Sequence, residues 1–256
     1  LSIGYYDSVY IDIVTSIFML LFGVNFSVYF LLLVRKFKAA LTDSEFLGYF
    51  GIALGAAVLI ALDIIDEYGG FWNAFRYSLF QVSSLMTTTG FATADFTLWP
   101  AFSKSILIIV MLIGASAGST GGGLKVSRVI IFFKCAAAEL GRMLNPRRTV
   151  SIRVNGKAIA TSTVHNTLVF ISLYFLLTFV ITALVSLDGY DFETTFASVV
   201  SCMSNVGPGL GPAGPMGSFD IYSDLSKVLL SFAMLAGRLE IFPMLLLFSP
   251  DTWRRH

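Results

Sequence analysis

Two short segments of the chain combine small polar residues with a glycine in a pattern that suits cation coordination. They are Thr87-Thr88-Thr89-Gly90-Phe91 and Ser204-Asn205-Val206-Gly207-Pro208. A dehydrated cation inside a membrane needs a ring of oxygen ligands, and backbone carbonyls supply one where an irregular loop lines a protected cavity. Gly90 and Gly207 permit the unusual backbone angles that turn successive carbonyls to one side. Taken singly, each segment is also an ordinary surface turn.

Each segment follows a short helical stretch that is suited to hold it. Trp72–Met86 is amphipathic, and at about 1.5 Å per residue it reaches only some 22 Å, too short to cross roughly 30 Å of hydrocarbon. Phe192–Met203 is shorter still. Both are predicted to be re-entrant half-helices whose negative C-terminal dipole ends point at the bound ion.

The two segments also occupy equivalent places in an internal repeat. A single gapless register that places Gly90 on Gly207 pairs five further similar or identical residues. These pairs are Phe75 with Phe192, Val82 with Val199, Ser84 with Ser201, Met86 with Met203, and Thr87 with Ser204. The match predicts a repeated unit of span, short re-entrant segment and span. Chance similarity between apolar helices is the alternative interpretation.

The composition indicates a membrane protein rather than a soluble one. Hydrophobic residues make up 56% of the 256-residue chain and charged residues only 13%, whereas a soluble domain carries about a quarter charged residues. Apolar runs long enough to span a bilayer recur along the chain. They are Val14–Val34, Phe46–Ile65, a run after Trp99-Pro100 that breaks at Gly114–Gly123 and resumes over Val126–Lys134, Thr163–Leu187, and Leu225–Phe248. The second run begins at Thr42-Asp43-Ser44-Glu45, which has the form of a capping box.

The charges divide between the two expected sides of the membrane. If the re-entrant segments enter from one side, most basic residues fall on the other, which the positive-inside rule makes cytoplasmic. The C-terminus, with Arg254 and Arg255, lies on that cytoplasmic side. Acidic residues gather on the opposite face, where they would concentrate cations at the mouth of a pore. They are Asp66, Glu67, Asp95, Asp188, Asp191, Glu193, Asp220 and Asp224, against only Arg76, Lys104 and Lys227.

Three motifs make the sequence similar to a known family. They are the first segment at residues 87–91, the run Ala117-Gly118-Ser119-Thr120-Gly121-Gly122-Gly123-Leu124-Lys125, and the ending Gly237-Arg238-Leu239-Glu240-Ile241-Phe242. The chain resembles the Trk, Ktr and HKT potassium transporters over its whole length, and most of all the C-terminal half of the bacterial Trk-type membrane subunit. The resemblance implies an all-α membrane protein, in which repeated units of helix, re-entrant pore helix and helix surround a central ion pore.

That family has four such repeats, each of which supplies one filter loop. By resemblance, residues 1–45 hold the last helix of a preceding repeat and a cytoplasmic loop, 46–156 a third repeat with a broken second helix, and 157–256 a fourth repeat. Two filter loops are therefore missing and must come from N-terminal repeats or another chain. Because the chain opens without a methionine, we expect it to be part of a longer polypeptide.

The resemblance implies potassium uptake across the bacterial plasma (inner) membrane through a channel-like pore. The two segments would then be selectivity-filter loops, and Gly90 and Gly207 agree with the glycine that favours potassium in the family. The only bound species expected is the transported potassium ion, with no organic cofactor. Expected partners are membrane lipid, a second copy in a homodimer and a cytosolic nucleotide-binding regulatory subunit, but no nucleic acid. Arg147 and Arg148 suit either anionic lipid or that subunit.

The glycine-rich run is expected to act as a gate. By resemblance, Gly118, Ser119, Thr120, Gly121, Gly122 and Gly123 form an intramembrane loop under the filter, with Lys125 beside it and Arg238 as an electrostatic barrier. The run could instead be a close-packed helix interface. A nucleotide-binding loop does not fit, because Lys125 lacks the required spacing and Val126 is neither Ser nor Thr. Arg238 could instead pair with Glu240 or with a carbonyl near the cytoplasmic end.

Two other classes of function fit the sequence less well. An alternating-access carrier coupled to sodium or protons, working as a symporter, also uses broken helices, although repeats that enter from one face favour a pore. An intramembrane enzyme is not expected, because no segment places a serine with a histidine, or paired aspartates, at membrane depth. Cys135 and Cys202 lie in or beside apolar segments without metal-ligand spacing and are expected to be small packing residues.

Overall fold

The computed structural model describes residues 2–145 and 151–239. The α-helices in this part of the chain are α1 (Val9–Phe22), α2 (Phe26–Leu33), α3 (Phe37–Leu41), α4 (Ser44–Asp63), α5 (Phe71–Met86), α6 (Ala101–Ile113), α7 (Val126–Leu144), α8 (Thr161–Val185), α9 (Phe192–Ser204) and α10 (Asp224–Arg238). The strands are β1 (Arg153–Val154) and β2 (Lys157–Ala158), which form a small antiparallel hairpin. Short 3-10 helices are η1 (Ile3–Tyr6), η2 (Phe96–Leu98), η3 (Ser186–Asp188), η4 (Gly211–Ala213) and η5 (Phe219–Ile221).

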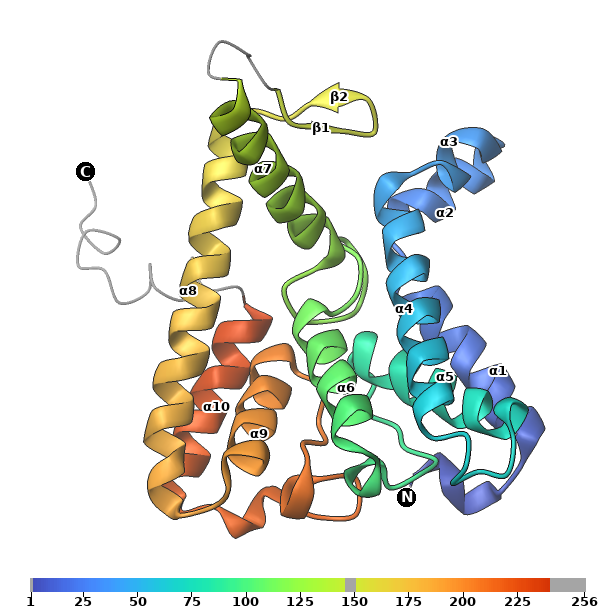
Figure 1. The fold of residues 1–256 in the computed structure, drawn as a ribbon, viewed down its shortest axis with the longest axis vertical. Helices are drawn as coiled ribbons and strands as arrows, with labels where there is room; N and C mark the ends of the chain where they lie inside the picture. The colour runs from blue at the N-terminus through green and yellow to red at the C-terminus, as the bar shows by residue number, and fades with distance from the viewer. Residues whose placement is uncertain (1, 146–150, 240–256) are drawn as a thin grey trace.

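Two helical bodies lie side by side, and each encloses one short helix (Figure 1). One core packs residues of α1, α4 and α6 around α5, and the other packs residues of α8 and α10 around α9. Leu112, near the end of α6, packs against both cores. The predicted all-α membrane fold is confirmed: α4 and α8 are long and apolar enough to cross a bilayer.

The short helices predicted over Trp72–Met86 and Phe192–Met203 are present as α5 and α9. They contain 16 and 13 residues, which corresponds to only about 24 and 20 Å of helix. Asp191 caps α9, since its carboxylate accepts a hydrogen bond from the backbone N–H of Thr194 at 3.0 Å. The last turns of both helices are buried in the protein, so their C-terminal ends face other residues rather than lipid.

The prediction of one continuous helix over Val14–Val34 is wrong, although the bent pair that replaces it is together long and apolar enough to be one broken span. The chain breaks after Phe22, and α1 and α2 meet at 90°. Asn25 explains the break, because its side chain accepts a hydrogen bond from Ser27 N at 2.8 Å and so starts a new helix. Gly23 at the break lies so close to Tyr49 that a Cβ atom there would sit 2.2 Å from the phenol oxygen. Apolar composition alone does not reveal such a break.

Two smaller expectations also change, and a third is described only in part. The N-cap of α4 is Asp43, which accepts from Glu45 N at 2.9 Å and Phe46 N at 3.0 Å. Thr42 and Glu45 therefore form no capping box, and the Glu45 side chain points into the protein instead. The run that resumes at Val126 continues as a helix to Leu144, well beyond Lys134. The last predicted span is helix to Arg238 with Leu239 as its C-cap, and residues 240–248 lie outside the described residues.

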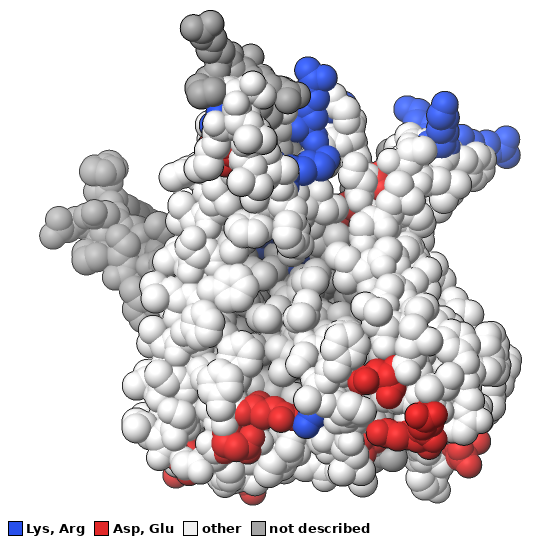
Figure 2. Space-filling model, in the orientation of Figure 1, with Lys and Arg blue, Asp and Glu red and all other residues white. Residues whose placement is uncertain are grey.

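The charges separate along the long axis (Figure 2). On the face shown, Lys and Arg gather at the end that carries α3 and the hairpin, and Asp and Glu gather mainly at the opposite end. The three basic residues expected on the acidic side all contact acids: Arg76 with Asp12 at 3.8 Å, Lys104 with Glu193 at 2.6 Å, and Lys227 with Asp220 at 2.8 Å. Arg147, Arg148, Arg254 and Arg255 lie outside the described residues.

Candidate functional site

The first loop (residues 87–91) and the second loop (residues 204–208) leave their helices with the same hydrogen-bond pattern. The register that places Gly90 on Gly207 also relates the backbone bonds that close each helix. These bonds are Thr89 N to Ser84 O (2.9 Å) with Val206 N to Ser201 O (2.9 Å), and Thr88 N to Leu85 O (3.3 Å) with Asn205 N to Cys202 O (3.1 Å). The two loops are therefore equivalent in backbone geometry and not only in sequence.

Left-handed backbone angles recur at matched positions in the two loops. Thr88 has φ 56° and Asn205 has φ 57°, and the matched glycines Gly90 and Gly207 have φ 79° and 117°. Threonine rarely adopts this conformation, so the surrounding contacts must hold it there. Alternation of such angles changes the direction of successive carbonyl groups, which is the property that a carbonyl cation site requires.

The two loops touch each other. A Cβ atom on Gly90 would lie 2.3 Å from the carbonyl oxygen of Val206 and 3.2 Å from Pro208 Cδ. Around Gly207, by contrast, a Cβ atom would meet nothing within 4 Å. Gly90 is thus needed both for its backbone angle and for the close approach of the second loop, while Gly207 is needed for its angle alone.

Buried hydroxyl groups hold both loops from behind. Ser84 Oγ donates to Phe91 O at 2.6 Å, and the matched Ser201 Oγ accepts from Gly207 N at 3.1 Å. Tyr174 of α8 shares a 2.9 Å hydrogen bond with Ser204 Oγ, and both side chains are buried. Ser84 and Ser201 are a matched pair in the sequence, but their residue types alone do not assign them to the site. Nothing in the sequence singled out Tyr174.

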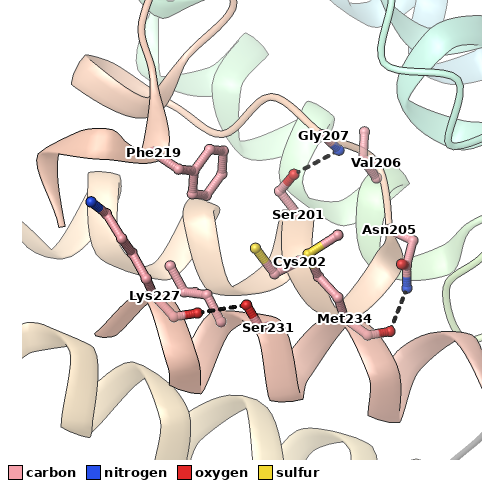
Figure 3. Close-up of a pocket in the computed structure, with 10 residues that line it drawn as sticks. Ser201, Cys202, Asn205, Val206, Gly207, Phe219, Lys227, Ser231 and Met234 are labelled. Carbon is pink, nitrogen blue, oxygen red and sulfur yellow. Dashed lines mark hydrogen bonds between the residues drawn. The ribbon is translucent and has the colours of Figure 1, made fainter. Parts of the chain in front are cut away.

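A cavity of about 420 Å³ lies between the second loop and α10 (Figure 3). Asn205 points across to α10, where its Nδ2 donates to Met234 O at 3.1 Å. Ser201, Val206 and Gly207 line one side of the cavity, and Lys227 lies on α10 at the other. The second loop is therefore tied to α10 by a side chain from its left-handed residue.

The small-residue loop (residues 114–123) separates α6 from α7 and folds back on the end of α6. Leu124 N donates to Leu112 O at 3.0 Å, and Lys125 N donates to Ile113 O at 2.9 Å. Positive φ angles at Gly114, Gly118 and Gly123 allow this closed path. The predicted break in the third apolar run is therefore a compact loop and not a bend within a continuous helix.

The small-residue loop lies directly against the ends of α5 and α9. Gly122 N donates to the hydroxyl oxygen of Thr88 at 2.9 Å. A Cβ atom on Gly121 would lie 3.2 Å from Thr87 O, and one on Gly122 would lie 2.1 Å from Ser204 O. A side chain at Gly122 would therefore clash with Ser204 O, and one at Gly121 would crowd Thr87 O, so the loop packs closely against both carbonyl groups.

Two cationic side chains contact the same loop. Lys125 Nζ donates to Gly121 O, and Arg238 Nη1 donates to Thr120 O at 3.2 Å. Together with Gly118 to Gly123, both cations line a cavity of about 290 Å³. The structure therefore brings the predicted gate residues together. Glu240, one of the two alternative partners of Arg238, lies outside the described residues; the contact that Arg238 does make is with a backbone carbonyl, the other kind of partner considered.

Two acidic groups near the N-terminal ends of α9 and α10 favour their charged form. Hydrogen bonds from the Thr194 hydroxyl and backbone N–H lower the pKa of Asp191. A hydrogen bond from Lys227 lowers the pKa of Asp220. Among the described residues, no group of three or more His, Cys, Asp or Glu side chains is placed to hold a metal ion. The oxygen atoms gathered around the two loops are mainly backbone carbonyls and hydroxyls.

Comparison with known proteins agrees with the geometry. The family model TrkH, described as "Cation transport protein", matches residues 71–255. The chain is 34% identical over 256 residues to the Trk system potassium uptake protein TrkG of Escherichia coli K12 and 36% identical to TrkH of the same organism; each match covers 99% of this chain. These alignments cover 52% and 53% of the relatives, so the chain spans about half of their length.

A solved structure gives the same result in three dimensions. The crystal structure of the potassium transporter TrkH from Vibrio parahaemolyticus superposes with a TM-score of 0.90 at 35% identity. The match covers 99% of this chain and 55% of that one. Both the resemblance in sequence and the helical membrane fold are thereby confirmed. The chain belongs to the TrkH family of cation transport proteins.

Proposed function

We propose that this chain forms half of a channel-like pore for potassium uptake in the bacterial inner membrane, with its C-terminus on the cytoplasmic side. The first and second loops supply two of the backbone loops whose carbonyl groups together form the ring of a selectivity filter, and the small-residue loop closes the pore beneath them. The transported ion is K⁺, and the activity is transport rather than catalysis. The names of the relatives, potassium uptake proteins of the Trk system, support this choice of cargo.

One observation carries the proposal: two loops of matched backbone geometry meet at Gly90 and Val206 above a glycine loop. Two unrelated surface turns are not expected to share a hydrogen-bond pattern and the positions of their left-handed residues, or to contact each other. A pair of equivalent carbonyl loops around one axis is what a cation site built from repeats requires. Because α5 and α9 end at these loops, their dipoles add negative potential there.

The small-residue loop is suited to gating by its composition. It contacts both loops through glycines, and a glycine segment can move aside without exposing a buried charge to lipid. Lys125 and Arg238 hold the carbonyls of Gly121 and Thr120. Their positive charge beside the loop opposes the passage of a cation while the loop stays in place.

We propose that the remaining filter loops come from the portion of the full-length protein that this chain does not span. We propose that this portion completes the ring around the same axis. The assembled protein is proposed to act as a homodimer with a cytosolic nucleotide-binding regulatory subunit. The lengths and apolar composition of α4 and α8 support a location in the membrane. The positive-inside rule assigns the basic end shown in Figure 2 to the cytoplasm.

The test is rubidium and sodium uptake by the full-length transporter in liposomes. Gly90→Ser is expected to reduce rubidium uptake or its preference over sodium by on the order of tenfold, because it combines left-handed strain with a clash against Val206 O. Gly207→Ser, which adds strain without a clash, is expected to have a smaller effect. Gly69→Ser is the control, since Gly69 has φ 66° with nothing within 4 Å of a Cβ atom. Unchanged uptake and selectivity in both loop variants would refute the filter assignment.

A further inference from the structure

Glu45 is a buried carboxylate that accepts hydrogen bonds from three separate segments. Its side chain belongs to the first turn of α4, and the residue is only 9% exposed. Oε1 accepts from Ala117 N at 2.6 Å and from Ser127 N at 3.2 Å. Oε2 accepts from Asn25 Nδ2 at 3.2 Å. A buried carboxylate with these partners is held in one position and holds them in turn.

The partners of Glu45 lie at the two breaks in the helical structure. Asn25 lies at the break between α1 and α2, Ala117 directly precedes residues 118–123, and Ser127 is in the first turn of α7. The breaks also contact each other directly, because Phe26 N donates to Gly118 O and Ser116 N donates to Gly23 O, each at 3.1 Å. Glu45 thus joins the residues on both sides of the segment 118–123 to Asn25, which lies outside the small-residue loop.

We propose that Glu45 is the positioning residue of the gate: it fixes both ends of residues 118–123 and anchors them to Asn25. This inference rests on the proposed function of that loop as a gate. Loss of the anchor frees the loop to leave its place against Thr88 and Ser204. In the sequence, Glu45 stands out only as the last residue of a capping-box pattern at the start of an apolar helix, which is a common position for an acidic residue.

In the contact between Glu45 and Asn25, the amide donates and the carboxylate accepts. The proposal can therefore be tested by reversing these roles with an amide at position 45 and a carboxylate at position 25. Asn25 Oδ1 already accepts from Ser27 N, so its amide cannot turn over without loss of the α2 cap. In Glu45→Gln, one oxygen still serves Ala117 and Ser127, but the new NH₂ group faces the NH₂ group of Asn25. In Asn25→Asp, the cap is kept, but two carboxylates face each other. In the double variant, the glutamine NH₂ donates to the free aspartate oxygen, and every bond is restored.

The experiment is hydrogen exchange, followed by mass spectrometry, on the full-length transporter in detergent. Each single variant is expected to speed amide exchange in residues 116–127 by about tenfold or more, since hydrogen bonds to a charged acceptor are lost or weakened. The double variant, with unchanged net charge, is expected to return within about threefold of the original rate. Glu139→Gln is the control: Glu139 is exposed on α7 and pairs with Arg142.

Two results would overturn the proposal. One is exchange in Glu45→Gln that equals the Glu139→Gln control. The other is a double variant whose amides in residues 116–127 exchange as fast as those of the faster single variant. The pairing of Glu45 with Asn25 would then not hold the loop. Rubidium uptake on the same proteins separates this inference from the proposed function. Faster exchange with unchanged uptake would leave Glu45 as the anchor of the loop and reject the loop as a gate.

Discussion

Gly122 is the residue at which contact between the small-residue loop and the second loop is most sensitive to a single atom. Its backbone lacks a positive φ, so alanine adds no conformational strain there. The added Cβ atom would lie 2.1 Å from Ser204 O and 3.0 Å from the Ser204 carbonyl carbon. We therefore expect Gly122→Ala to push the loop away from the second loop without altering its intrinsic backbone preference.

The size of the effect follows from the required displacement. Real Cβ contacts essentially never fall below 3.0 Å, so the loop or the carbonyl must move by about 1 Å, an overpacking that typically costs about 1–3 kcal/mol. The shift also lengthens the 2.9 Å bond from Gly122 N to Thr88 Oγ1. If the position of the loop in this structure is the closed state of the pore, this cost shifts the equilibrium between closed and open states roughly 5- to 150-fold toward the open state.

The assay is rubidium uptake by the full-length transporter in liposomes at fixed protein density. Gly122→Ala is expected to raise uptake well above that of Gly51→Ala, a glycine in α4 where a Cβ atom would meet nothing within 4 Å. Thermal unfolding of both variants provides the check on folding. Uptake at the level of Gly51→Ala in a protein that is folded would show that contact with Ser204 does not restrain the loop, and the gating argument would fail.

Two further predictions concern what holds the second loop and its helix. The pKa of Asp191 is lowered in the folded protein by Thr194, so its stabilising contribution is present above its unfolded pKa of about 3.9 and is lost as pH falls through the lower folded value. The unfolding midpoint of Asp191→Asn should therefore fall less between about pH 5 and pH 2 than that of the original protein, and parallel curves would contradict this. Tyr174→Phe should cost about 1 kcal/mol because it leaves the buried Ser204 hydroxyl without its partner, whereas adding Ser204→Ala should recover most of that loss. Denaturant unfolding measures both, and a double variant as unstable as the sum of the two singles would count against the bond.

Much of the fold could be predicted because membrane solvation acts on each segment locally. Lipid requires long apolar helices, and that requirement is legible in composition at Phe46–Ile65 and Thr163–Leu187. The short helices could be predicted because their length and the glycines after them are also local features. The break after Phe22 could not, because it depends on Asn25 and on the approach of Tyr49 to Gly23. The boundaries proposed for the repeats stay a prediction.

By itself, the sequence determined the class of protein, the two equivalent loops and the glycine run, because each is encoded by residue type and by one gapless register. Only the tertiary structure decided how these parts meet. It places Gly122 against Ser204, Gly90 against Val206, and Glu45 between two breaks that are far apart in the chain. The physical reason is that contacts between distant segments depend on the summed packing of the helices that carry them, and no periodicity or local motif records that sum.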